Sequence, residues 1–249
     1  MKSGKAFSRF NPLRLRPIPL MVAAIGVSAA MQALAADPVT EAMTRAYARY
    51  RVALFRTNSG AQAESQQAIA DAQQALGQVV TRYGKQPAAP YDRDASFAAS
   101  LAKVAAVYEK AAGETRANQL PHAHETLEEA RDLLAELRRR NQVIVYSDHM
   151  NASHAQMELV LKEGPGLLSG SGMIDLAGKA GALDYLARHL QSEAPADLAA
   201  DGEFKLAAAA VTKSVADLNT ALQRQDAAAI KEALGKLKGP YSRMFLKFG

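Results

Sequence analysis

Apolar residues recur every three or four positions along most of this chain, which is the period of an amphipathic helix. The segment from about Pro38 to Thr57, for example, places Met43, Tyr50 and Leu54 on one face. Alanine dominates the composition, together with other strong helix formers. Alternation with period two is rare, and residues 143–146 form the only strand-like run. The pattern therefore predicts an all-α fold.

Glycine and proline divide this pattern into separate helices. Further helices are expected over about 61–83, 94–118, 174–191, 204–223 and 227–236, with a short segment over 241–248. Another begins at Pro121 and either stops near Asn141 or continues to Lys162. The expected architecture is a bundle of about six to seven helices built from αα-hairpins. Its expected core leucines are Leu76, Leu101, Leu134, Leu137, Leu218 and Leu234.

The first 35 residues have the layout of a secretory signal peptide. Basic residues precede a short apolar run over 20–31, and Ala33-Leu34-Ala35 supplies an A-x-A cleavage site. The apolar run is shorter than the roughly 20 residues of a membrane span, so no stable span is expected after cleavage. We expect a periplasmic protein with residues 36–249 as its helical domain. The Gly/Ser-rich stretch 164–172 is a possible internal boundary.

Charge and cysteine content exclude several classes of function. The chain has 30 basic and 25 acidic residues, and five of the basic ones precede residue 36, so the mature domain has 25 of each. The densest basic run, Arg138-Arg139-Arg140, follows several acidic residues, which argues against nucleic-acid binding. The chain has no cysteine, which excludes disulfides, thiolate metal ligands and covalent haem attachment.

One segment, residues 146–158, carries the residues best suited to chemistry. On a helix, Met150, His154 and Glu158 share one face. Imidazole with thioether suits copper, and imidazole with carboxylate suits zinc. The face is therefore a candidate metal site, with a packing role for the same face as the alternative. His149 lies too far round the helix to join His154 on one ion.

A second candidate lies in the first turn after Pro121. His122 with Glu125, and His124 with Glu128, have ligand-like spacing. An unbroken helix would hold His124 and His154 about 45 Å apart. A break near 141–146 would permit a joint site.

The exported, all-helical chain resembles in class the periplasmic four-helix-bundle electron carriers of the cytochrome c′ and b562 type. That resemblance would imply haem, but the c′ attachment motif is missing. Met43 matches the early b562 ligand, while the last-helix histidine is absent, leaving only His154 or His189 as a substitute. Haem is therefore not expected. The segment 133–158, with its Ser-Asp-His-Met-Asn stretch, is also similar to uncharacterised proteobacterial exported proteins.

Two hypotheses for function follow. The first is a non-catalytic exported protein with a binding or envelope role, whose partner is an unidentified protein or small ligand. The second is a metal-handling protein that binds copper or another divalent ion through the Met/His/Glu face. The sequence shows no motif that pairs a nucleophile with a base, so an enzyme is the less favoured class.

Overall fold

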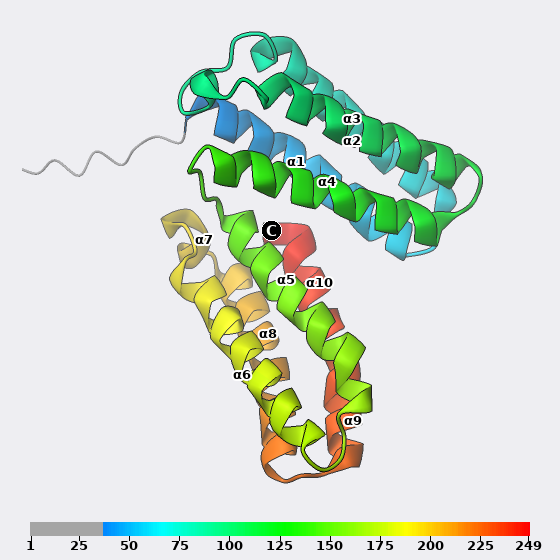
Figure 1. Cartoon of the computed structure of the whole chain (residues 1–249), viewed down its shortest axis with the longest axis vertical. Coiled ribbons are helices and arrows are strands. Elements are labelled where there is room, and N and C mark those ends of the chain that lie inside the picture. Colours follow the sequence, from blue (N-terminus) through cyan, green and yellow to red (C-terminus); the bar gives the residue numbers. More distant parts are fainter. Residues whose placement is uncertain (1–36) are drawn as a thin grey trace, which may run out of the picture. The chain divides into compact units, whose positions relative to one another are not determined.

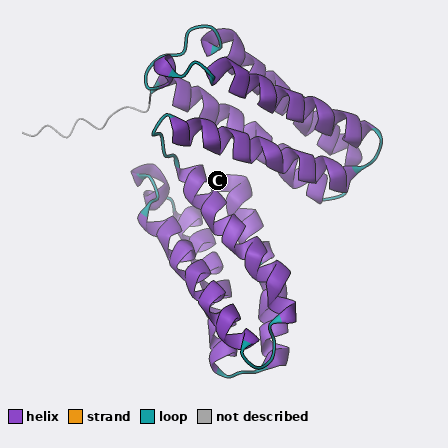
Figure 2. Cartoon of the chain, in the orientation of Figure 1, coloured by secondary structure: helices purple, strands orange, loops and turns teal. Residues whose placement is uncertain are grey.

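The computed structural model describes residues 37–249, which are helices and connecting loops with no strand between them (Figure 2). The all-α prediction is confirmed. The predicted signal peptide, 1–35, lies outside the described residues. Within 37–249, no helix has both the length and the apolar character needed to cross a bilayer.

The first four long helices form one group, in which each packs against the next and α1 also contacts α4 (Figure 1). These are α1 (Pro38–Asn58), α2 (Gln62–Tyr83), α3 (Phe97–Arg116) and α4 (Leu120–Arg140), with a 3₁₀ turn at Tyr91–Arg93 before α3. Asp37 begins α1 as its N-cap, because its carboxylate accepts the Thr40 N–H at 2.7 Å.

The remaining helices form a second group, in which α8 packs against α6, α9 and α10. They are α5 (Tyr146–Glu163), α6 (Gly172–Ser192), α7 (Ala196–Ala200), α8 (Gly202–Gln223), α9 (Ala227–Lys236) and α10 (Lys238–Phe248), with a 3₁₀ turn at Gly164–Gly166 after α5. The described residues thus form more helices than the six to seven expected. Residues 121–162 form two helices, and α7 and α10 are separate elements. The stretch 164–172 connects α5 to α6, which pack together as a hairpin.

Burial of one side of each long helix produces the core. All six leucines expected in the core are buried, each no more than 4% exposed. They belong to one contiguous cluster that draws on both groups of helices. The helical period therefore identified the core correctly.

The ambiguous helix over 121–162 ends at Arg140, because the chain turns there through a left-handed residue. Gln142 has φ +58°, the Val143 N–H donates to the Arg138 carbonyl at 3.0 Å, and the Gln142 N–H donates to the Arg139 carbonyl at 3.1 Å. This is a Schellman motif, which satisfies the last carbonyls of a helix. Residues 143–145, the strand-like run, are the extended connection, and α5 starts at Tyr146.

A buried ion pair crosses this turn. Arg138 is only 3% exposed, and its Nε and Nη2 donate to both carboxylate oxygens of Asp148 at 2.5–3.2 Å. The same carboxylate accepts the Val145 N–H at 3.0 Å, so it also caps α5. Of the two neighbouring arginines, Arg139 pairs with Glu136 and Arg140 with Asp94. The basic run is therefore three separate ion pairs.

Removing the buried guanidinium should destabilise the fold strongly. Arg138→Met leaves the Asp148 carboxylate without its cation, so we expect the free energy of unfolding to fall by about 3 kcal/mol or more. Arg139→Met is the matched control, because Arg139 is 78% exposed and its pair is worth about 0–1 kcal/mol. Urea denaturation measures both losses. Equal losses in the two variants would contradict a structural role for the buried pair.

Candidate functional site

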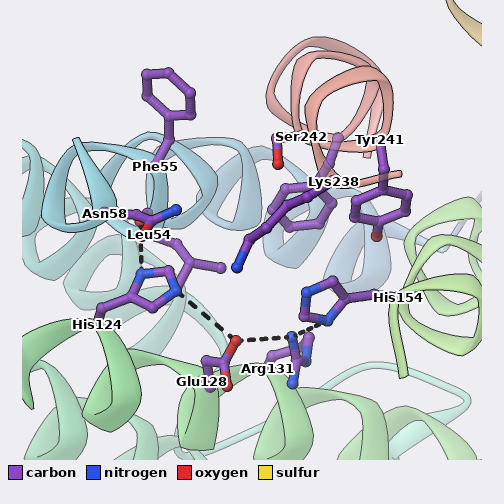
Figure 3. A pocket seen from close by; sticks show the side chains of 11 residues that line it. Leu54, Phe55, Asn58, His124, Glu128, Arg131, His154, Lys238, Tyr241 and Ser242 are labelled. Atoms are coloured by element: carbon purple, nitrogen blue, oxygen red, sulfur yellow. Dashed lines mark hydrogen bonds and ion pairs between the residues drawn. The ribbon is translucent and has the colours of Figure 1, made fainter. Parts of the chain in front are cut away.

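A small cavity lies where α1, α4, α5 and α10 meet (Figure 3). Its lining residues are Leu54, Phe55, Asn58, His124, Glu128, Arg131, His154, Lys238, Tyr241, Ser242 and Phe245. The space open to water-sized molecules is about 50 Å³. One water needs about 10–15 Å³ on this measure, so the cavity has room for a few waters or for one small polar group.

The turn after α4 brings two of the sequence candidates to this cavity. His124 and His154 are 30 residues apart, and both line it. The chain breaks between 141 and 145, which is the break that a joint site of His124 and His154 requires. The α5 helix then starts at Tyr146 and carries His154 to the cavity.

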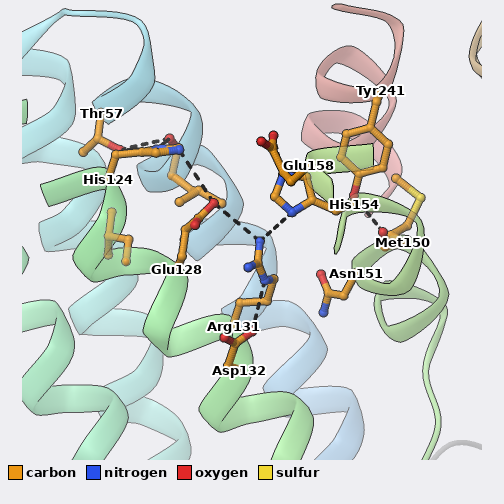
Figure 4. A network of polar contacts seen from close by, with 12 residues as sticks. Thr57, His124, Glu128, Arg131, Asp132, Met150, Asn151, His154, Glu158 and Tyr241 are labelled. Carbon is orange, nitrogen blue, oxygen red and sulfur yellow. Dashed lines mark hydrogen bonds and ion pairs between the residues drawn. The ribbon is translucent and has the colours of Figure 1, made fainter. Parts of the chain in front are cut away.

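The charged environment of His154 fixes the orientation of its ring (Figure 4). Arg131 Nη1 lies 2.8 Å from His154 Nδ1, and a guanidinium can only donate, so Nδ1 is the acceptor. His154 Nε2 then carries the hydrogen and faces Glu158 Oε1 at 3.5 Å. The imidazole stacks on the Tyr241 ring with centroids 5.4 Å apart. Both ring nitrogens of His154 therefore face partners within the protein.

Glu158 completes this side of the cluster. Its Oε1 also lies 3.4 Å from Lys238 Nζ. The contact with His154 and the nearby Lys238 ammonium together lower the pKa of Glu158 to about 2, against the opposing effect of burial. Both contacts are longer than a good hydrogen bond, and the ammonium charge of Lys238 adds to the effect of the His154 contact.

His124 lies at the other side of the cavity in the opposite tautomer. Its Nδ1 is 3.0 Å from the Leu54 carbonyl, which can only accept, so Nδ1 carries the hydrogen. Its Nε2 faces Glu128 Oε1 at 3.9 Å. Burial lowers the pKa of His124, although the Glu128 carboxylate partly opposes this shift. The neutral ring thus presents a lone pair toward Glu128.

Arg131 connects the two histidines, and sequence reasoning missed it. Besides its bond to His154, it lies 3.6 Å from Glu128 and 3.3 Å from Asp132. Lys238 and Tyr241 were also missed as site residues. The Glu128–Arg131 spacing on one helix was visible in the sequence. No local pattern indicated that α10 would lie beside α5.

Met150, His154 and Glu158 lie on one face of α5, as predicted, but their donor atoms already contact other groups of the protein. Met150 is fully buried, and the His154 Nδ1 lone pair accepts from Arg131. Within residues 37–249, no three His, Cys, Asp or Glu side chains are placed to hold one ion. His122 is exposed. Copper or zinc binding at Met150, His154 and Glu158 remains a prediction, and a metal there would have to displace Arg131.

Comparison of the chain with protein-family models, with curated proteins and with solved structures found no match. These comparisons therefore link the chain neither to the cytochrome c′ and b562 type nor to the proteobacterial exported proteins.

The lowered pKa of His124 predicts a pH dependence of stability. The unfolded chain takes up the His124 proton at a higher pH than the folded protein does. The free energy of unfolding should therefore fall as the pH drops below about 6.5 and through the folded pKa. Chemical denaturation between about pH 7.5 and pH 5 measures this slope. In His124→Gln the slope should be smaller.

His122→Gln serves as the control, since His122 is exposed two residues away on the same helix. Its pH slope should match that of the unmodified protein. If His124→Gln retained the full slope, the neutral ring assigned to His124 would be wrong.

Proposed function

We propose that this protein is an exported, non-catalytic binding protein of the cell envelope, and that it holds a small ligand in the cavity between α1, α4, α5 and α10. The metal-handling alternative stays a prediction for the same region.

The main observation in support of this proposal is that the cavity combines apolar walls with ionisable side chains. Four helices line one space of about 50 Å³, and three of them, α4, α5 and α10, contribute ionisable side chains to it. Small-ligand sites typically combine apolar walls with a few placed polar groups. Here Leu54 and Phe245 supply apolar surface, while His124, Glu128 and Lys238 supply polar groups.

A binding role fits these groups better than a reaction does. His154 is held between Arg131 and Glu158, and His124 is held by a backbone carbonyl. Groups oriented in this way can recognise a ligand without moving. A catalytic histidine, by contrast, needs a proton-transfer partner in reach. The one hydroxyl beside a ring nitrogen is that of Thr57, 3.3 Å from His124 Nδ1, and it donates its hydrogen to backbone carbonyls of α1 while Nδ1 carries a hydrogen of its own. His124 Nδ1 therefore cannot act as a base toward this hydroxyl.

Export rests on the signal-like pattern of residues 1–35. The A-x-A site places the expected cleavage after Ala35. N-terminal sequencing of the protein recovered from the cells that produce it should begin at Ala36. A sequence beginning at Met1 in the envelope fraction would contradict processing at this site.

Ligand binding can be tested by ligand-detected NMR on the purified protein. The panel contains small carboxylates, amines, zwitterions and oxyanions. At least one class should bind, and Ser242→Trp should abolish that binding because the indole fills the cavity that Ser242 lines.

Ser192→Trp is the matched control, since Ser192 is exposed near the end of α6 and does not line the cavity. It should bind the same class as the unmodified protein. No binding by any class, or unchanged binding in Ser242→Trp, would contradict the proposed function.

A further inference from the structure

The cavity contains two hydrogen-bond acceptors that face each other. His124 Nδ1 donates to the Leu54 carbonyl, so Nε2 of the neutral ring accepts. Glu128 Oε1 lies 3.9 Å from this nitrogen, beyond hydrogen-bond range, and a carboxylate also only accepts. A donor placed between them could bond to both at about 2.8 Å. A primary ammonium group has the required hydrogens.

One cationic donor and one hydroxyl donor line the same cavity as this acceptor pair. Lys238 projects from α10 into the cavity, where its Nζ lies between the two histidines (Figure 3). Its contact with Glu158, at 3.4 Å, leaves ammonium hydrogens for another acceptor. Ser242 lies one turn further along α10 and lines the same space, so its hydroxyl adds a second donor.

These charges discriminate between classes of ligand. A simple anion that reached Lys238 would also approach the Glu128 carboxylate. A simple cation that reached Glu128 would approach Lys238 and Arg131. A molecule that carries one positive and one negative group can place each group beside the opposite charge of the protein. This lowers both the anion–Glu128 repulsion and the repulsion of a cation by Lys238 and Arg131.

Building on the proposed function, we propose that the ligand is a small zwitterion of the α-amino-acid type. Its ammonium group sits between His124 Nε2 and Glu128 Oε1, and its carboxylate bonds to Lys238 Nζ and the Ser242 hydroxyl. The size of the cavity limits the buried part to this charged head. Leu54, Phe55 and Phe245 supply apolar surface for a short side chain.

The first test is selectivity in the unmodified protein, measured by calorimetry or ligand-detected NMR near neutral pH. The probes are glycine and L-alanine, with acetate and methylammonium as single-charge analogues. The zwitterions should bind at least about tenfold more tightly than either analogue. If acetate or methylammonium bound as tightly as glycine, the inference would be overturned and the proposed function would stand. If no probe of any class bound, both would be overturned.

The second test uses two substitutions with matched controls. Glu128→Gln and Lys238→Met should each weaken glycine binding by at least about tenfold. The controls Glu125→Gln and Lys236→Met change exposed residues on α4 and α9 and should leave it unchanged. Circular dichroism confirms that each variant is folded. Folded Glu128→Gln or Lys238→Met protein that bound glycine normally would refute the placement of the two charged groups.

Discussion

The ion pair between Arg138 and Asp148 is the contact on which the rest of the arrangement depends. In an unbroken helix, residues ten apart would be separated by about 15 Å along the axis. The pair can therefore form only if the chain leaves the helix between them. A buried guanidinium without its carboxylate would be costly, so the pair favours the turn over a continuous helix. The left-handed conformation of Gln142 provides that turn.

The cavity follows from this change of direction. Arg131 precedes Arg138 by seven residues, so both lie on the same face of α4. Each of the two meets a side chain of α5, since Arg131 bonds to His154 as Arg138 bonds to Asp148. The Tyr47 hydroxyl donates to Asn151 between these contacts, at 3.2 Å. On the far side, Arg51 of α1 donates to the Phe245 carbonyl of α10 at 2.8 Å. The contacts surround a polar space that neither group of helices forms alone.

The sequence predicted what depends on local periodicity. The helical class, the buried leucines and the shared face of Met150, His154 and Glu158 all follow from spacing along one helix. Whether the chain breaks near 141–146 or continues as one helix did not, because Gln142 adopts a conformation usually marked by glycine. In the sequence Arg138 is one of three consecutive arginines, and nothing there distinguishes it as the buried one that pairs with Asp148. The chemistry of His154 depends on Arg131 and Lys238, which lie on other helices, so no spacing rule could identify them.

The most direct measurement of this arrangement is the protonation state of the two histidine rings by ¹⁵N NMR near neutral pH, with each signal assigned through its His→Gln variant. We expect both rings to be neutral, with His154 carrying its hydrogen on Nε2 and His124 on Nδ1. The Arg131 guanidinium at His154 Nδ1 and the Leu54 carbonyl at His124 Nδ1 account for these two tautomers. A charged His154, or one with its hydrogen on Nδ1, would contradict the contact between α4 and α5 at the centre of the site.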